Sequence, residues 1–195
     1  MTLKNLSSEG RIDHRDFLDR VDLLRELGHP VLISNYGEFH RLASYLFRFT
    51  KQPVGLVMGI PTLRELFEEK YYADLAGGIL ESFGRMFKNE LRLYVYPYRE
   101  PKTGSIITAG NLRIAPHLRH LYMYLAENHF IQGIRDVSEQ SLDIFSRDVL
   151  RMLQSGEPGW EARIPARVAQ LIKERKLLGY REPGEAAPAP ATARP

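Results

Sequence analysis

The sequence of 195 residues contains no cysteine. This absence excludes a disulfide scaffold, thiolate metal ligation and a cysteine nucleophile. No stretch approaches the roughly 18 uncharged apolar residues of a membrane span, and the first residues lack the apolar core of a signal peptide. From the residues alone we therefore expect a cytoplasmic protein that does not associate with membranes.

An excess of charge of one sign is also lacking. The chain has 27 Lys and Arg against 24 Asp and Glu, and a net charge of +3 is too small to predict a polyanionic partner. The distribution is uneven, because residues 85–120 hold seven basic and two acidic side chains. An anionic ligand therefore has one preferred part of the chain.

The hydrophobic pattern predicts an α/β fold. Apolar residues at helical spacing predict a helix over 13–27, and short apolar runs predict strands at 31–33, 53–58 and 91–98, with a fourth at 105–109. Helical patterns lie between these runs, one of them reaching about Thr50. Alternating strands and helices predict a parallel three- to four-stranded sheet flanked by helices, with right-handed crossovers.

The rest of the sequence predicts helices and little else. Helical patterns over 116–130, 138–153 and 165–178 form a helical C-terminal third. The length fits one cooperative domain. We divide the chain into an N-terminal extension (1–12), a single α/β domain (13–180) and a disordered tail rich in Pro and Ala (181–195).

The loops that follow the predicted strands are the candidate binding site. In an open parallel sheet such loops gather at a switch point, where helix N-termini offer free amides to anions. The candidate ligand-binding residues supply hydroxyls, backbone amides and positive charge to a phosphate: Ser34, Asn35, Gly59, Thr62, Arg99, Arg119 and His120. The alternative is structural, with Ser34 or Asn35 as a helix cap and Thr62 and Glu65 as a capping box.

Several catalytic signatures are missing. Neither G-x-G-x-x-G nor the P-loop pattern occurs, and there is no G-x-S-x-G or H-E-x-x-H. His117 and His120 have a spacing that suits one metal ion, but a third ligand is missing. We therefore predict no metal site and assign no catalytic residue.

One predicted strand face combines aromatic and basic side chains: Arg92, Tyr94, Tyr96 and Tyr98. Aromatics interleaved with cations can stack single-stranded bases. The same alternation suits a half-buried strand whose tyrosines lie under a helix. Because a parallel strand is usually covered on both faces, we favour the second interpretation and do not expect nucleic acid as the partner.

Several phrases of the sequence resemble one protein family. They include Gly77-Gly-Ile-Leu-Glu-Ser-Phe-Gly84, Leu93-Tyr-Val-Tyr-Pro97, Leu118-Arg-His-Leu-Tyr122 and Ile144-Phe-Ser-Arg-Asp-Val-Leu150. Over about residues 10–180 the chain resembles the C-terminal part of longer bacterial proteins labelled nicotinate- or nicotinamide-nucleotide adenylyltransferase, or TonB-receptor-associated protein. The resemblance implies a link to nicotinamide-nucleotide metabolism and an N-terminal half that this chain lacks. The chain would then be a separate subunit, a truncated reading frame or a domain that meets its partner in trans. It transfers no catalytic residue, because the H-x-G-H-type signature and the Ser/Thr-Lys phosphate loop are absent.

Three functions follow as hypotheses. The first is a nucleotide- or sugar-phosphate-binding domain, with nucleotidyl or phosphoryl transfer, and then magnesium, if it catalyses a reaction. The second is a non-catalytic module for oligomerisation or protein interaction, which requires an exposed apolar patch. The third is binding of single-stranded nucleic acid. Stabilisation by nucleotides that Arg99→Ala reduces would favour the first hypothesis over the second.

Overall fold

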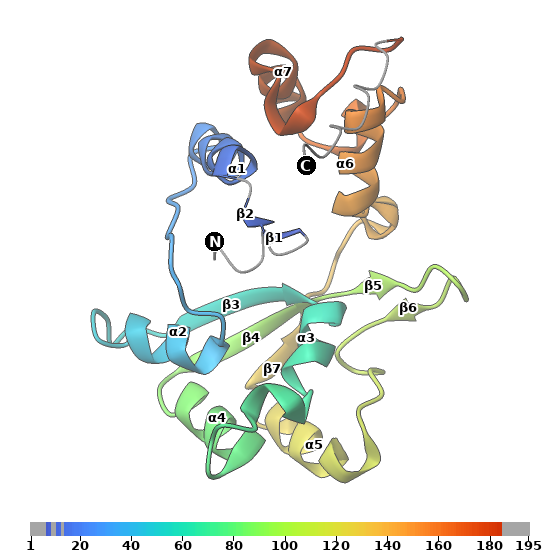
Figure 1. Ribbon diagram of the computed structural model, residues 1–195. Helices are drawn as coiled ribbons and strands as arrows, with labels where there is room; N and C mark the ends of the chain where they lie inside the picture. The colour runs from blue at the N-terminus through green and yellow to red at the C-terminus, as the bar shows by residue number, and fades with distance from the viewer. Residues whose placement is uncertain (1–6, 9–10, 13, 185–195) are drawn as a thin grey trace, which may run out of the picture. The chain divides into compact units, whose positions relative to one another are not determined.

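The computed structural model describes residues 7–8, 11–12 and 14–184 (Figure 1). It divides the chain into two compact units. Unit 1 combines Met1–Asn35 with Ile144–Pro195, and unit 2 is Tyr36–Asp143. That residues 13–180 unfold as one cooperative domain stays a prediction. Most of the extension 1–12 and the tail from residue 185 lie outside the described residues.

Unit 2 contains a parallel sheet of three strands. Its order is β3 (Val54–Gly59), β4 (Leu91–Tyr96) and β7 (Ile131–Gly133), with β4 at the centre. Every residue of β3 pairs with one of β4, from Val54 beside Leu91 to Gly59 beside Tyr96. The predicted fold class is confirmed, although β7 was not among the predicted strands.

The helices of unit 2 lie before, between and after these strands. They are α2 (Phe39–Leu46), α3 (Ile60–Leu66), α4 (Gly78–Met86) and α5 (Arg119–Glu127), with 3₁₀ turns η2 (Glu69–Tyr72), η3 (Pro116–Leu118) and η4 (Glu139–Asp143). The strands lie in the sheet in the order in which the chain forms them. Right-handed crossovers between consecutive neighbours place all connecting helices on one face, and Figure 1 shows α3, α4 and α5 on the same side.

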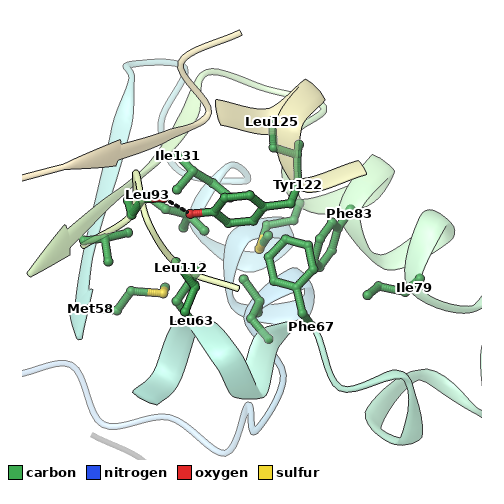
Figure 2. Close-up of a cluster of buried hydrophobic side chains, with 14 of the residues drawn as sticks. Met58, Leu63, Phe67, Ile79, Phe83, Leu93, Leu112, Tyr122, Leu125 and Ile131 are labelled. Carbon is green, nitrogen blue, oxygen red and sulfur yellow. Dashed lines mark hydrogen bonds between the residues drawn. The ribbon is translucent and has the colours of Figure 1, made fainter. Parts of the chain in front are cut away.

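The helix-covered face of the sheet forms the core of unit 2 (Figure 2). Leu91, Leu93 and Val95 alternate along β4 and are all but fully buried, as their period-two pattern predicts. Phe67 meets the rings of Phe83 and Tyr122 edge to face, with centroids 5.0 and 5.4 Å apart. The Tyr122 hydroxyl donates to the carbonyl of Ala109, and burial raises its pKa to about 12.

Two of the predicted strands were wrong or misplaced. Residues 31–33 form no strand, and Leu32 and Ile33 are 46% and 51% exposed, because a short apolar run does not by itself establish burial. The fourth strand is reduced to β6 (Ile106–Ile107), which pairs antiparallel with β5 (Tyr98–Arg99) in a separate ribbon. The three-stranded sheet instead gains β7.

The predicted helix ending near Thr50 is shorter, because α2 ends at Leu46. Phe49, which we expected to point inward, is 74% exposed. Within α2, the buried His40 ring lies 3.2 Å (Nδ1 to Oγ) from the buried Ser82 hydroxyl on α4. Burial lowers the pKa of His40.

Unit 1 is mainly helical. Its elements are α1 (His14–Glu26), α6 (Ser146–Ser155), η5 (Glu161–Arg163), α7 (Ala166–Arg175), η6 (Leu177–Gly179) and a short pair, β1 (Ser7–Ser8) with β2 (Arg11–Ile12). Helix α1 matches the predicted helix over 13–27. The helical C-terminal third is confirmed as well.

The core of unit 1 surrounds Trp160, which is 2% exposed and lies among Leu153, Leu171 and Ile172. The ring of Tyr180 packs 5.7 Å from that of Trp160. Contacts continue beyond Tyr180, since the amide of Arg181 donates to the carbonyl of Leu153. Ordered chain therefore reaches into the segment that the sequence assigns to the tail.

Candidate functional site

The carboxyl ends of the strands do not meet at a switch point. A switch point requires that the strand order reverse, whereas β3, β4 and β7 follow one another in chain order. The run at 31–33 adds no strand, so Ser34 and Asn35 do not follow one. Both residues belong to unit 1, whereas the other five predicted ligand residues belong to unit 2.

Gly59 and Thr62 lie where β3 passes into α3. Helix α3 begins at Ile60, with Gly59 at its N-cap and Pro61 in its first turn. Thr62 therefore lies inside the helix, and no side chain caps the helix N-terminus. The predicted capping box of Thr62 and Glu65 was wrong. Proline fits the first turn of a helix, which explains why the helix starts earlier.

Arg99 is held by carboxylates. Its Nε lies 2.9 Å from Asp143 Oδ1 and its Nη2 lies 3.4 Å from Glu139 Oε2, both on η4. A third guanidinium contact goes to the carbonyl of Gly104, 3.3 Å away. One cation faces two anions here, and a phosphate would have to compete with both. The geometry therefore ties the β5–β6 ribbon to η4, and ligand binding by Arg99 stays a prediction.

Arg119 and His120 occupy the first turn of α5, and both side chains are exposed. Within the described part of the chain, no hydrogen bond or ion pair joins either of them to Gly59, Thr62 or Arg99. Their neighbour His117 pairs with Glu69 on η2, Nε2 to Oε2 at 2.7 Å. Phosphate binding by these residues stays a prediction.

The described residues also contain no cluster of three or more His, Asp or Glu side chains suited to a metal ion. The only buried polar side chains among them are His40 and Ser82. This pair has the residue types of a nucleophile and its base. With exposures of 4% and 2% it is closed to substrate, and it serves to join α2 to α4.

The second face of the parallel sheet is the most unusual surface of unit 2. Because side chains alternate along a strand, the residues between the buried ones point to this face. Six of them are Gly55 and Val57 on β3, Arg92, Tyr94 and Tyr96 on β4, and Gln132 on β7. We call these six residues the open face. All helices named above that connect the strands lie on the other side.

Val57 and Tyr94 lie side by side at the centre of the open face. Val57 is 70% exposed and lies directly beside Tyr94 in the register of the two strands. The ring of Tyr94 extends across Gly55, where an added Cβ would come within 2.9 Å of Tyr94 Cε2. Only glycine lets the ring lie against the neighbouring strand in this way. Arg92 is the single charged side chain among the six residues.

Comparison with known protein families, with curated proteins and with solved structures finds no match for this chain. The family resemblance described above therefore stays a prediction. Among the described residues, none of the helices combines the length and the apolar character that crossing a membrane requires.

Sequence reasoning anticipated part of the open face. It identified Arg92, Tyr94 and Tyr96 as one face of a strand, but expected a helix to cover them. It missed Gly55 and Val57, which contribute the flat and apolar part. The available signal was the pattern of β3, in which Leu56 and Met58 alternate with Gly55 and Val57 just as buried and outward residues alternate in β4.

Proposed function

We propose that this protein is a non-catalytic interaction module, and that its open face packs against the same face of a second copy. The observation that carries the proposal is the exposure of Val57 at the centre of a parallel sheet face. Parallel sheets are found almost only with both faces covered. A face that the helices of its own unit leave uncovered is a surface that association would cover.

The composition of the open face favours a protein partner. Tyrosine and arginine are enriched among the residues that dominate protein interfaces, and charged residues are depleted at interface centres. With one cation in six residues, the face offers little to neutralise the phosphates of a nucleic acid. A face with a single charged side chain needs no partner of opposite charge. The same face of a second copy can therefore pack against it.

The test measures the mass of the protein in solution by sedimentation equilibrium. We expect a dimer for the natural chain and a monomer for Val57→Glu, because the variant buries a carboxylate without a partner in the interface. The Val57 side chain points away from the core, so the fold and its circular dichroism should not change. Val57→Thr keeps the branched shape without a charge and should remain dimeric.

A matched control places the same charge on the helical side. Leu80 on α4 is 65% exposed, and Leu80→Glu should leave the dimer intact. A monomeric natural chain, or dissociation by Leu80→Glu and not by Val57→Glu, would overturn the proposal. Salt-sensitive binding of single-stranded DNA that Val57→Glu abolishes would instead assign the face to nucleic acid. Stabilisation by nucleotides would return support to the phosphate-binding hypothesis.

A further inference from the structure

A cavity of about 270 Å³ lies in unit 1. Its lining comes from three elements that are far apart in the sequence: Arg15, Asp16 and Asp19 on α1, Gln154 on α6, and Lys176, Leu178 and Gly179 at the turn after α7. Pockets for drug-sized ligands begin at about 300 Å³, so this volume suits a smaller molecule.

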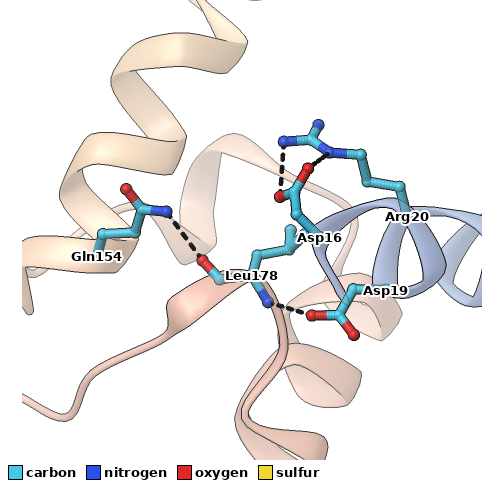
Figure 3. Close-up of polar contacts among 5 residues, drawn as sticks. All are labelled: Asp16, Asp19, Arg20, Gln154 and Leu178. Atoms are coloured by element: carbon cyan, nitrogen blue, oxygen red, sulfur yellow. Dashed lines mark hydrogen bonds and ion pairs between the residues drawn. The ribbon is translucent and has the colours of Figure 1, made fainter. Parts of the chain in front are cut away.

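The cavity wall is built around the backbone of one residue, Leu178 (Figure 3). The amide of Leu178 donates to Asp19 Oδ2 at 2.8 Å, and the carbonyl of Leu178 accepts from Gln154 Nε2 at 3.1 Å. Asp19 and Gln154 each use one polar atom in these hydrogen bonds to the Leu178 backbone. The second carboxylate oxygen of Asp19 and the amide oxygen of Gln154 remain as acceptors. Asp16 is held by Arg20 through two contacts of 2.7 and 3.1 Å.

The backbone at the cavity is unusual for its residue types. Lys176 and Leu178 have φ values of +50° and +56°, in the left-handed region that glycine occupies at least cost. Lys176 ends α7 there, a position where helices commonly use glycine. A lysine in this place costs stability, and it brings an ammonium group to the cavity. Its ion partner, Glu182, is 3.8 Å away, and both side chains are about two-thirds exposed.

The charges of the lining define the ligand class. Asp19 and Lys176 bring opposite charges to the same small space, so a purely anionic or purely cationic molecule meets like charge there. A small molecule that carries both charges fits both residues. We propose that the cavity binds a free α-amino acid, with its ammonium group on Asp19 and Gln154 and its carboxylate on Lys176.

The experiment titrates the full chain with the standard L-amino acids by calorimetry. We expect at least one to bind, whereas its decarboxylated amine and its deaminated acid bind at least about tenfold more weakly, as the loss of one charge-assisted hydrogen bond predicts. Asp19→Asn keeps an oxygen for the Leu178 amide but removes the charge, and should weaken binding to a similar extent. Asp22→Asn, one turn further along α1, is the matched control and should bind like the natural chain.

Lys176 provides the sharper test. Lys176→Gly should raise the melting temperature, since glycine relieves the left-handed backbone, and should weaken amino-acid binding about tenfold. Lys176→Arg keeps the charge and should retain binding. Absence of binding by every amino acid, or binding that neither Asp19→Asn nor Lys176→Gly weakens, would overturn the assignment. Neither result depends on whether the chain dimerises through Val57.

Discussion

Unit 2 and unit 1 build their cores from differently arranged parts of the chain. Unit 2 is one continuous segment, and its core lies between three parallel strands and the helices that connect them. Unit 1 joins both ends of the chain, and its core lies among helices around Trp160. A continuous unit folds from one segment, whereas unit 1 must bring together two segments that are separated by the whole of unit 2. The stability of unit 1 should therefore depend on unit 2 more than that of unit 2 depends on unit 1.

The largest expected effect tests this dependence from the side of unit 2. Leu93 is fully buried in the central strand, and Leu93→Ala should cost roughly 3 kcal/mol. Unfolding of unit 2 frees the chain that links the two parts of unit 1, which raises the entropic cost of closing unit 1. Trp160 is the only tryptophan of the chain and reports on unit 1. Its fluorescence transition in urea should move to lower concentration.

An unchanged Trp160 transition in Leu93→Ala would show that the two units unfold separately. That result would also contradict the single cooperative domain that the sequence predicts. Far-ultraviolet circular dichroism of the same samples is the control, because it records the loss of stability in unit 2 itself.

The reverse experiment should give a more local result. Leu153 is 1% exposed in the core of unit 1, and Leu153→Ala should cost roughly 3 kcal/mol there. Because unit 2 is continuous, its closure does not depend on unit 1. Hydrogen exchange of the β4 amides should stay at the natural rate while the Trp160 transition moves. Faster exchange in β4 would remove the asymmetry between the units.

The smallest expected effect is a difference in pH dependence. Burial lowers the pKa of His40 in unit 2 below its ordinary value, whereas no buried histidine is described in unit 1. As pH falls through the ordinary value of about 6.5, the unfolded chain takes up a proton before the folded one. The free energy of unfolding is therefore highest above this value and decreases as pH falls towards the lowered pKa.

His40→Gln keeps a group that can bond to Ser82 but does not titrate. Between about pH 7.5 and about pH 5.5, melting of the natural chain should decline more than melting of this variant. Equal declines would mean that His40 does not contribute. Melting followed by Trp160 fluorescence and by β4 amide exchange would assign the effect to one unit.

The sequence predicts well those elements whose own residues determine them. Strands β3 and β4 and helix α1 have clear periodicity, and each lies within about a residue or two of its predicted position. Strand β7 is only three residues long, which is too short to show a hydrophobic pattern. These residues form a strand because they pair with β4. The run at 31–33 shows the opposite case, because its apolar residues predict burial that the fold does not provide.

The candidate sites were harder to predict for a related reason. Phosphate binding at Arg99 depends on which groups face the guanidinium, and Glu139 and Asp143 lie about forty residues away in the chain. The cavity at Leu178 joins α1 to the far end of the chain, and its left-handed residues carry no sequence signal. Composition can indicate which residues are available for chemistry, but only tertiary contacts determine which of them are already engaged.

Gly55 gives the open face a property that no larger residue could. Because it has no side chain, it leaves room for the tyrosine ring of the next strand to lie close to the backbone. A single methyl group at this position would push the ring outward and turn a level plane into a ridge. The contour of the whole surface is thus set by the smallest side chain on it.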